Sequence, residues 1–128
     1  IAPTAVKWAS KRYPHENIRW VVGDLLQPNK EWLKAFDLVL EVHILQAIPE
    51  EFRIPASRNL SPLVSPSGQL VCIGRLSVDD SVEHIGPPWP LSKEFISSVG
   101  NNLKSIDFTP AQFEGEESIR YRAVWTNE

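Results

Sequence analysis

Three short apolar runs constrain the fold of this chain more than any other feature of its sequence. They are IRWVV at residues 18–22, DLVL at residues 37–40 and QLVCIG at residues 69–74. Runs of this length, rich in β-branched side chains and bounded by turn-forming residues, are typical of strands that a parallel sheet buries on both faces. We therefore predict three buried strands, of which the first ends in a Gly-Asp turn.

Two helix signals flank the first of these runs. Pro3 suits a first helical turn and predicts a helix over residues 3–13. A short helix is predicted over residues 29–36, because Asn29 is a favourable N-cap. Its buried side is expected to consist of Trp32, Leu33 and Phe36.

Two further helices are expected beyond the second run. One is predicted over residues 49–63, where Pro55 and Pro62 should kink or shorten it. Ser92 is expected to cap the other, which runs to about Val99. Both helices lie between segments with strand patterns, as in folds that pack helices on a sheet.

The C-terminal part of the chain alternates apolar and polar residues. Residues 103–113 and 119–126 therefore predict two antiparallel strands joined by an acidic turn. With the earlier elements, the pattern predicts an α/β fold with a mostly parallel sheet and an antiparallel C-terminal strand pair. The length of 128 residues is that of a single domain, and we expect residues 1–128 to form one.

The composition limits the cellular location and the kinds of partner that we expect for this chain. The formal net charge of −3 argues against nucleic acid as a partner, since no basic excess is present to neutralise phosphates. The single cysteine, Cys72, cannot form an internal disulfide and favours a reducing, cytoplasmic location. The sequence has no apolar run long enough to cross a bilayer, so no membrane partner is expected.

The candidate site residues follow the predicted parallel strands, where open α/β sheets bind their ligands. Asp24 could accept a hydrogen bond from an amino group or a ribose hydroxyl, and Glu41 and His43 follow the central strand. Structural alternatives stay open for all three. An Asp in this position commonly forms a turn, a lone His is commonly a structural residue, and a Glu at a strand end is often only a surface residue.

Several other chemistries find no support in the sequence. It has no Gly-x-Ser-x-Gly nucleophile elbow and no glycine-rich phosphate loop. Cys72 lies inside an apolar run, where a core thiol is the expected reading. The three histidines do not have metal-ligand spacing, so no metal site is predicted.

Six motifs follow one another along the chain: APTAVKWASKRYP, NIRWVVGDLLQ, FDLVLEVHILQAIP, LSPLVSPSGQLVCIGR, GPPWPLSKEF and YRAVW. Their order resembles that of class I S-adenosylmethionine-dependent methyltransferases, and among them the small bacterial methyltransferase-domain proteins. The resemblance covers essentially the whole chain. It implies a Rossmann-like fold, S-adenosylmethionine as cofactor and methyl transfer to a small-molecule acceptor.

The resemblance also implies roles for individual residues. Asp24 and Leu25 match the acidic turn that contacts the adenine ring of the cofactor. Glu41, Val42 and His43 match the segment that lines its methionine end. If the reaction needs a base, Glu41 and His43 are the predicted catalytic residues.

The acceptor side is implied by three further matches. Gln46 lies just beyond the same segment, near the cleft. Arg75 and the stretch that includes Pro88 and Trp89 match the loop that borders the acceptor. An alternative for Trp89 is a rigid surface turn, or a staple over the core.

The chain departs from the family at its N-terminus. The family's glycine-rich cofactor turn, and the acid that contacts the ribose, precede the helix that begins here at Pro3. The family's sheet order is 3-2-1-4-5-7-6, so two absent strands would lie between residues 18–22 and residues 37–40. We therefore expect exposed strand edges, which a companion N-terminal segment, another pairing of the strands or self-assembly would cover.

Two functional hypotheses follow. In the first, the chain is the C-terminal two thirds of a methyltransferase domain and acts as part of a longer chain. In the second, it is a truncated, non-catalytic domain that self-associates or binds a partner through its open sheet edges. The missing glycine-rich turn disfavours catalysis by this chain alone.

Overall fold

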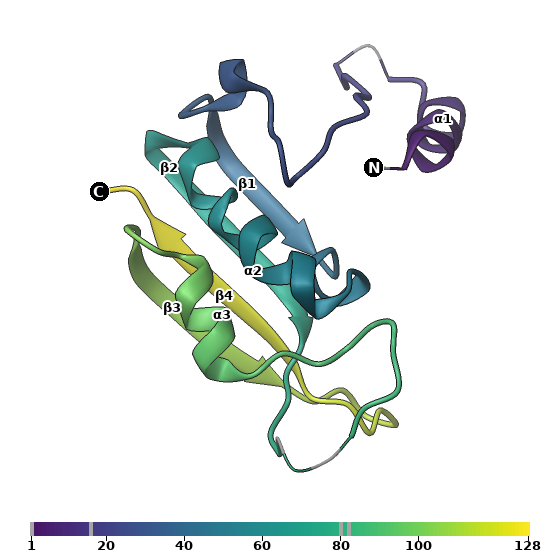
Figure 1. Cartoon of the computed structure of the whole chain (residues 1–128), viewed down its shortest axis with the longest axis vertical. Coiled ribbons are helices and arrows are strands. Elements are labelled where there is room, and N and C mark those ends of the chain that lie inside the picture. The colour runs from purple at the N-terminus through teal and green to yellow at the C-terminus, as the bar shows by residue number, and fades with distance from the viewer. Residues whose placement is uncertain (1, 16, 80, 82) are drawn as a thin grey trace.

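A four-stranded mixed sheet forms the centre of the structure (Figure 1). The computed structural model describes residues 2–15, 17–79, 81 and 83–128. In their order across the sheet, the strands are β1 (Phe36–Val42), β2 (Val64–Arg75), β4 (Arg120–Thr126) and β3 (Lys104–Ala111). β1 and β2 are parallel, whereas β4 is antiparallel to both of its neighbours.

The predicted α/β fold and its antiparallel C-terminal strand pair are confirmed, although the described sheet has one parallel strand pair and two antiparallel ones. Residues 18–22 were expected to form a buried strand, but they lie outside the sheet with exposed side chains. A strand needs a neighbour to satisfy its backbone, and no described segment pairs with this run. The other four strands do follow the 4-5-7-6 order that the resemblance implies.

The helices begin where their capping residues predict. The α-helices are α1 (Pro3–Arg12), α2 (Glu50–Arg58) and α3 (Lys93–Val99), and the 3-10 turns are η1 (Lys30–Trp32), η2 (Leu45–Ala47) and η3 (Ser61–Leu63). The Ser92 hydroxyl accepts a hydrogen bond of 3.1 Å from the Phe95 amide, which confirms the cap of α3. The Asn29 side chain accepts one of 3.0 Å from the Glu31 amide and so caps η1.

Two helix predictions need correction. The helix expected over residues 49–63 divides into α2 and η3, because Pro62 has no N–H to continue the helical hydrogen bonds. The short helix expected over residues 29–36 is limited to η1. Leu33 and Phe36, expected on its buried side, are 50% and 40% exposed.

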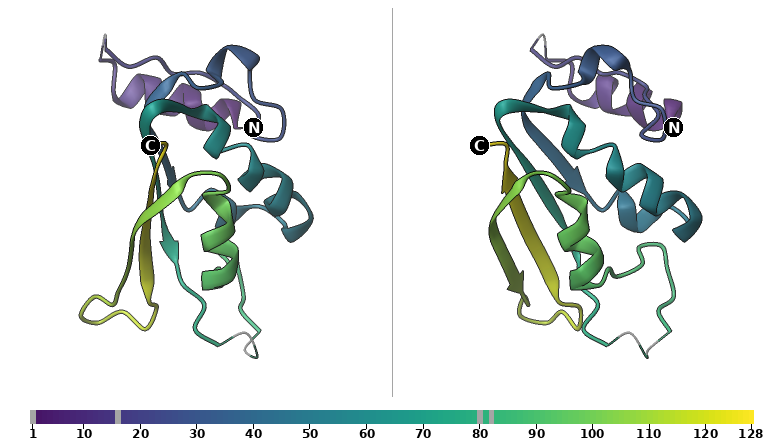
Figure 2. Two further views of the ribbon diagram at one scale, coloured as in Figure 1. Left: turned by 90° about the vertical axis from the view of Figure 1, so that its left-hand side faces the viewer. Right: turned by 60° about the vertical axis from the view of Figure 1, so that its left-hand side comes forward.

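One face of the sheet carries the core. α2 and α3 lie over this face, as the two views of Figure 2 show. The core includes buried side chains from β2, β4 and these helices: Leu70, Cys72, Tyr121, Ala123, Trp125, Ala56, Ile96 and Val99. Alternation along the strands leaves the neighbouring side chains on the opposite face.

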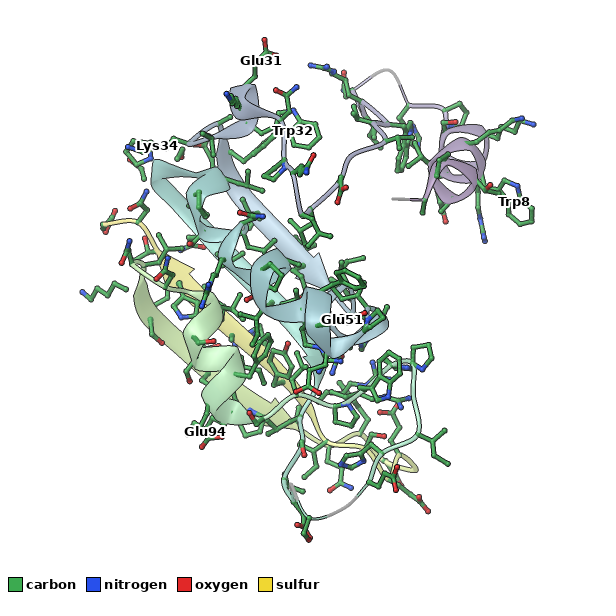
Figure 3. All side chains as sticks on the ribbon, viewed as in Figure 1. Trp8, Glu31, Trp32, Lys34, Glu51 and Glu94 are labelled. Carbon is green, nitrogen blue, oxygen red and sulfur yellow. The ribbon has the colours of Figure 1, made fainter. Side chains whose placement is uncertain are left out.

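The opposite face of β1 is open. Leu38, Leu40 and Val42 are 59%, 58% and 41% exposed, and we call this set the open face. Among the described residues, β1 pairs with β2 alone, so its outer edge has no strand neighbour. α1 lies apart from the sheet, and its Trp8 side chain points into solvent (Figure 3). Of the helices in the described part of the chain, none combines the length and apolar character that a membrane span requires.

Candidate functional site

The carboxyl ends of the parallel strands β1 and β2 lie side by side and bring several predicted site residues together. The His43 backbone N–H donates to the Ile73 carbonyl at 3.1 Å, so the strand pairing extends one residue beyond β1. His43 itself has a φ of 59°, in the left-handed region that non-glycine residues seldom occupy. This conformation turns the chain out of the strand and into η2.

Glu41 faces the core and is only 2% exposed. One carboxylate oxygen, Oε1, accepts hydrogen bonds from the backbone amides of Ile44 at 2.6 Å and Leu45 at 3.0 Å. The other oxygen, Oε2, is buried without a hydrogen-bond partner among the described residues. Burial raises the pKa of Glu41, and the two amides partly oppose that rise. Glu41 therefore caps η2 from inside the core.

Cys72 lies beside Glu41, its partner residue across the parallel strand pair. The thiol is buried, and its pKa is raised by burial and by the neighbouring Glu41 carboxylate. A thiol with a raised pKa carries little thiolate, the form that acts as a nucleophile. These observations agree with the expected core thiol.

Gln46 is the most heavily hydrogen-bonded side chain of the site and is 1% exposed. Its Nε2 donates to the carbonyls of Arg75 at 2.7 Å and Trp89 at 2.9 Å. Its Oε1 accepts from the Arg75 amide at 2.8 Å and lies 2.9 Å from Nδ1 of His43. Gln46 therefore joins the turn after β1 to the end of β2 and to the proline-rich loop that contains Trp89.

Trp89 and Arg75 lie next to two hollows at this end of the sheet. A hollow of about 410 Å³ is lined by Pro49, Glu50, Arg53, His84, Trp89 and Pro90. The Arg53 guanidinium lies 5.9 Å from the centre of the Trp89 ring, which is within the range of a cation–π contact. A second hollow, of about 300 Å³, includes Arg75 and Pro88 in its lining.

Asp24 and Leu25 form a separate corner of the site. Asp24 Oδ1 accepts a hydrogen bond of 2.9 Å from the Leu26 amide, which is the turn-forming role of such an aspartate. Leu25 packs against the core, and its carbonyl accepts a hydrogen bond of 2.8 Å from the Asn59 side chain at the end of α2. Among the described residues, no hydrogen bond or salt bridge joins Asp24 to Glu41 or His43.

Sequence reasoning missed Arg53 and Asn59. Arg53 donates to the carbonyls of Leu45 and Ile48 at 2.9 and 3.2 Å, which fixes its guanidinium beside Trp89. Asn59 anchors the Asp24 corner to α2. An arginine in a polar helix turn and an asparagine at a helix end both have ordinary surface roles, so local patterns contained no signal for these contacts.

Comparisons with known proteins agree with this arrangement. The chain is 31% identical over 86 residues to a thiopurine S-methyltransferase from Teredinibacter turnerae, a match that spans 67% of the chain and 39% of that relative. It superposes on the N-methyltransferase NodS from Bradyrhizobium japonicum with a TM-score of 0.74 and 21% identity, over 98% of the chain and 68% of NodS. For NodS in complex with S-adenosyl-L-homocysteine the TM-score is 0.71, over 98% and 62% of the two chains, again at 21% identity. No protein-family model matches the chain.

The chain therefore has the Rossmann-like fold of the class I S-adenosylmethionine-dependent methyltransferases, which confirms the fold that the motifs imply. At the level of sequence, the particular similarity is to thiopurine S-methyltransferase. The chain spans about two fifths of the length of that curated relative.

Proposed function

We propose that this chain forms part of an S-adenosylmethionine-dependent methyltransferase domain that acts on a small-molecule acceptor. The observation that carries the proposal is the fold: 98% of the chain superposes on a methyltransferase whose structure contains S-adenosyl-L-homocysteine. The sequence similarity to a thiopurine S-methyltransferase supports it independently. The site at the ends of β1 and β2 also lies where α/β folds bind their ligands.

The residues at this site fit such a cofactor in part. Asp24 uses Oδ1 for the Leu26 amide, so Oδ2 is available to accept a hydrogen bond from an amino or hydroxyl group. Leu25 follows Asp24 in the chain and Val42 precedes His43, and we assign both to the apolar surface of the cofactor site. The Glu41 carboxylate is turned into the core, so we assign it to holding η2 in place. When bound, the cofactor supplies a methyl group on a sulfonium that is already activated for transfer.

The other residues of the site orient the acceptor and handle its proton. His43 is the half-buried group at the strand end that could take a proton from the acceptor. Arg75, Pro88 and Trp89 border the acceptor, and Gln46 fixes the loop that contains Trp89. With these roles the site needs no catalytic triad, because the main tasks of the protein in methyl transfer are to position the acceptor and to exclude water.

Calorimetric titration of the chain with S-adenosyl-L-homocysteine tests the proposal. We expect binding in the micromolar range. Asp24→Asn should weaken it about tenfold, or about 1.4 kcal/mol, because the variant can keep the acceptor for Leu26 but replaces the second oxygen with a donor. Glu94→Gln, on the exposed side of α3, is the matched control and should bind as the wild type does. Absence of binding by the wild-type chain would contradict the proposal.

The open face favours a second candidate function, association with another copy of the chain or with a partner. Leu38, Leu40 and Val42 form an exposed apolar row on a strand whose outer edge is unpaired among the described residues. Exposed apolar edge strands promote pairing between chains.

Sedimentation equilibrium tests this candidate. We expect the chain to self-associate, and Leu40→Lys to raise the dissociation constant at least about tenfold, because a charge would be buried in the interface. Ala111→Lys, on the exposed edge strand β3, should leave association unchanged. A wild-type chain that stays monomeric at high concentration would exclude self-association.

A further inference from the structure

We propose that Gln46 is a positioning residue that holds the His43 imidazole in its Nδ1–H tautomer and so leaves Nε2 as the unprotonated nitrogen at the end of β1. The inference deepens the proposed function, on which it rests only for the use of Nε2 as a proton acceptor. The tautomer itself follows from hydrogen bonds within this chain.

The first step is the orientation of the Gln46 side-chain amide. Two backbone carbonyls, those of Arg75 and Trp89, lie 2.7 and 2.9 Å from one terminal atom of this amide. Carbonyl oxygens only accept hydrogen bonds, so that atom must be the NH₂ group. The Arg75 backbone N–H, which only donates, lies 2.8 Å from the other terminal atom, which must therefore be the oxygen. Three backbone groups thus fix the orientation.

The second step is to deduce from this orientation which imidazole nitrogen of His43 carries the hydrogen. Nδ1 of His43 lies 2.9 Å from Gln46 Oε1, an atom that can only accept. Nδ1 must therefore carry the hydrogen. A neutral imidazole has a single N–H, so Nε2 has a free lone pair and can accept a proton.

The backbone also restrains the ring. The His43 N–H is bonded to the Ile73 carbonyl, and its φ of 59° sets the direction in which the side chain leaves the chain. Gln46 is 1% exposed and cannot turn without breaking bonds to two other segments. The tautomer is therefore set by a buried group that does not depend on ligand.

A purely structural role for Gln46 is the alternative. The three bonds to Arg75 and Trp89 tie the loops together whichever tautomer His43 adopts. If Gln46 has only a structural role, His43 should populate both neutral tautomers, as an exposed histidine does. The two readings differ in one measurable quantity, the position of the imidazole hydrogen.

Long-range ¹H–¹⁵N correlation spectra of the ¹⁵N-histidine-labelled chain measure this quantity at a pH where the imidazoles are neutral. For His43 we expect a pyrrole-type shift at Nδ1 and a pyridine-type shift at Nε2. The exposed His15 and His84 are internal controls and should show the mixture of tautomers typical of free histidine. A predominant Nε2–H tautomer for His43 in the wild-type chain would overturn the proposal.

Gln46→Met tests the cause. Methionine keeps the length of the side chain but offers no comparable acceptor, so the ratio of Nδ1–H to Nε2–H at His43 should fall about fivefold, the factor that one hydrogen bond contributes. An unchanged ratio in the folded variant would assign the tautomer to another group. If the variant does not fold, the wild-type spectrum still decides between the two readings. Neither spectrum requires cofactor or acceptor, so failure of methyl transfer would leave this result standing.

Discussion

Glu41→Ala is expected to lower the free energy of unfolding by about 3 kcal/mol. The carboxylate accepts hydrogen bonds from the amides of Ile44 and Leu45, and the alanine variant leaves both donors without an acceptor. An unsatisfied buried donor costs about 1–3 kcal/mol, and the lost side chain also leaves a cavity beside Cys72. Urea denaturation of the chain measures the loss. A loss below about 1 kcal/mol would show that Glu41 does not hold η2 in place.

Glu41→Gln separates this capping role from the charge. The amide oxygen can accept the same two hydrogen bonds, so the variant should fold. Burial raises the pKa of Glu41 above its usual 4.5. At a pH between 4.5 and this raised pKa, the folded chain keeps a proton on Glu41 that the unfolded chain has released. Wild-type stability should therefore fall as the pH rises from about 4.5 through the raised pKa. Relative to the wild type, the Gln variant should become progressively more stable over that range.

Denaturation midpoints measured between pH 4 and pH 8 test this expectation. Glu51→Gln, in the exposed first turn of α2, is the matched control. It controls for the replacement of an exposed carboxylate by an amide. A stability difference between Glu41→Gln and the wild type that does not change with pH would contradict the raised pKa of Glu41.

The elements that were predicted correctly are those that local chemistry determines. Ser92 and Asn29 cap helices because their side-chain oxygens reach an amide two or three residues later. The paired strands β3 and β4 follow from alternating side chains on a connected hairpin. The run at residues 18–22 has equally strong strand composition but depends on a neighbour outside itself, and no described segment provides one.

The candidate site also has one feature that the sequence predicts and one that it does not. Its location was predictable, because the carboxyl ends of parallel strands meet at one edge of a sheet. The orientations of its side chains were not. Whether Glu41 faces the core or a ligand depends on how the strand turns into η2, and the contacts of Gln46 join segments 29 and 43 residues apart. Spacing along the chain carries no signal for contacts of that kind.

Gly74→Ala, like Glu41→Ala, is expected to be strongly destabilising. We expect it to lower the free energy of unfolding by about 3 kcal/mol. A Cβ at this position would overlap Gln46 Oε1 and lie 2.9 Å from its Cδ and 3.2 Å from Cε1 of Tyr121. Gln46 can make room only by giving up hydrogen bonds to Arg75, Trp89 and His43, each worth about 1 kcal/mol. The control is Gly115→Ala, where the surroundings are open and a φ of 81° makes backbone strain of about 1 kcal/mol the main cost.

A double-mutant cycle with Gln46→Ala identifies the cause of that loss. Removing the Gln46 side chain frees most of the space that the alanine Cβ needs, so Gly74→Ala should cost only about 1 kcal/mol in the Gln46→Ala background, where the contact with Tyr121 remains. The coupling energy between the two changes should therefore be about 2 kcal/mol, in the range found for residues in direct contact. Additive losses would mean that Tyr121 or the backbone of β2, and not the Gln46 amide, opposes a side chain at position 74. A large coupling would mean that the glycine at the end of β2 is required by the same amide that contacts His43.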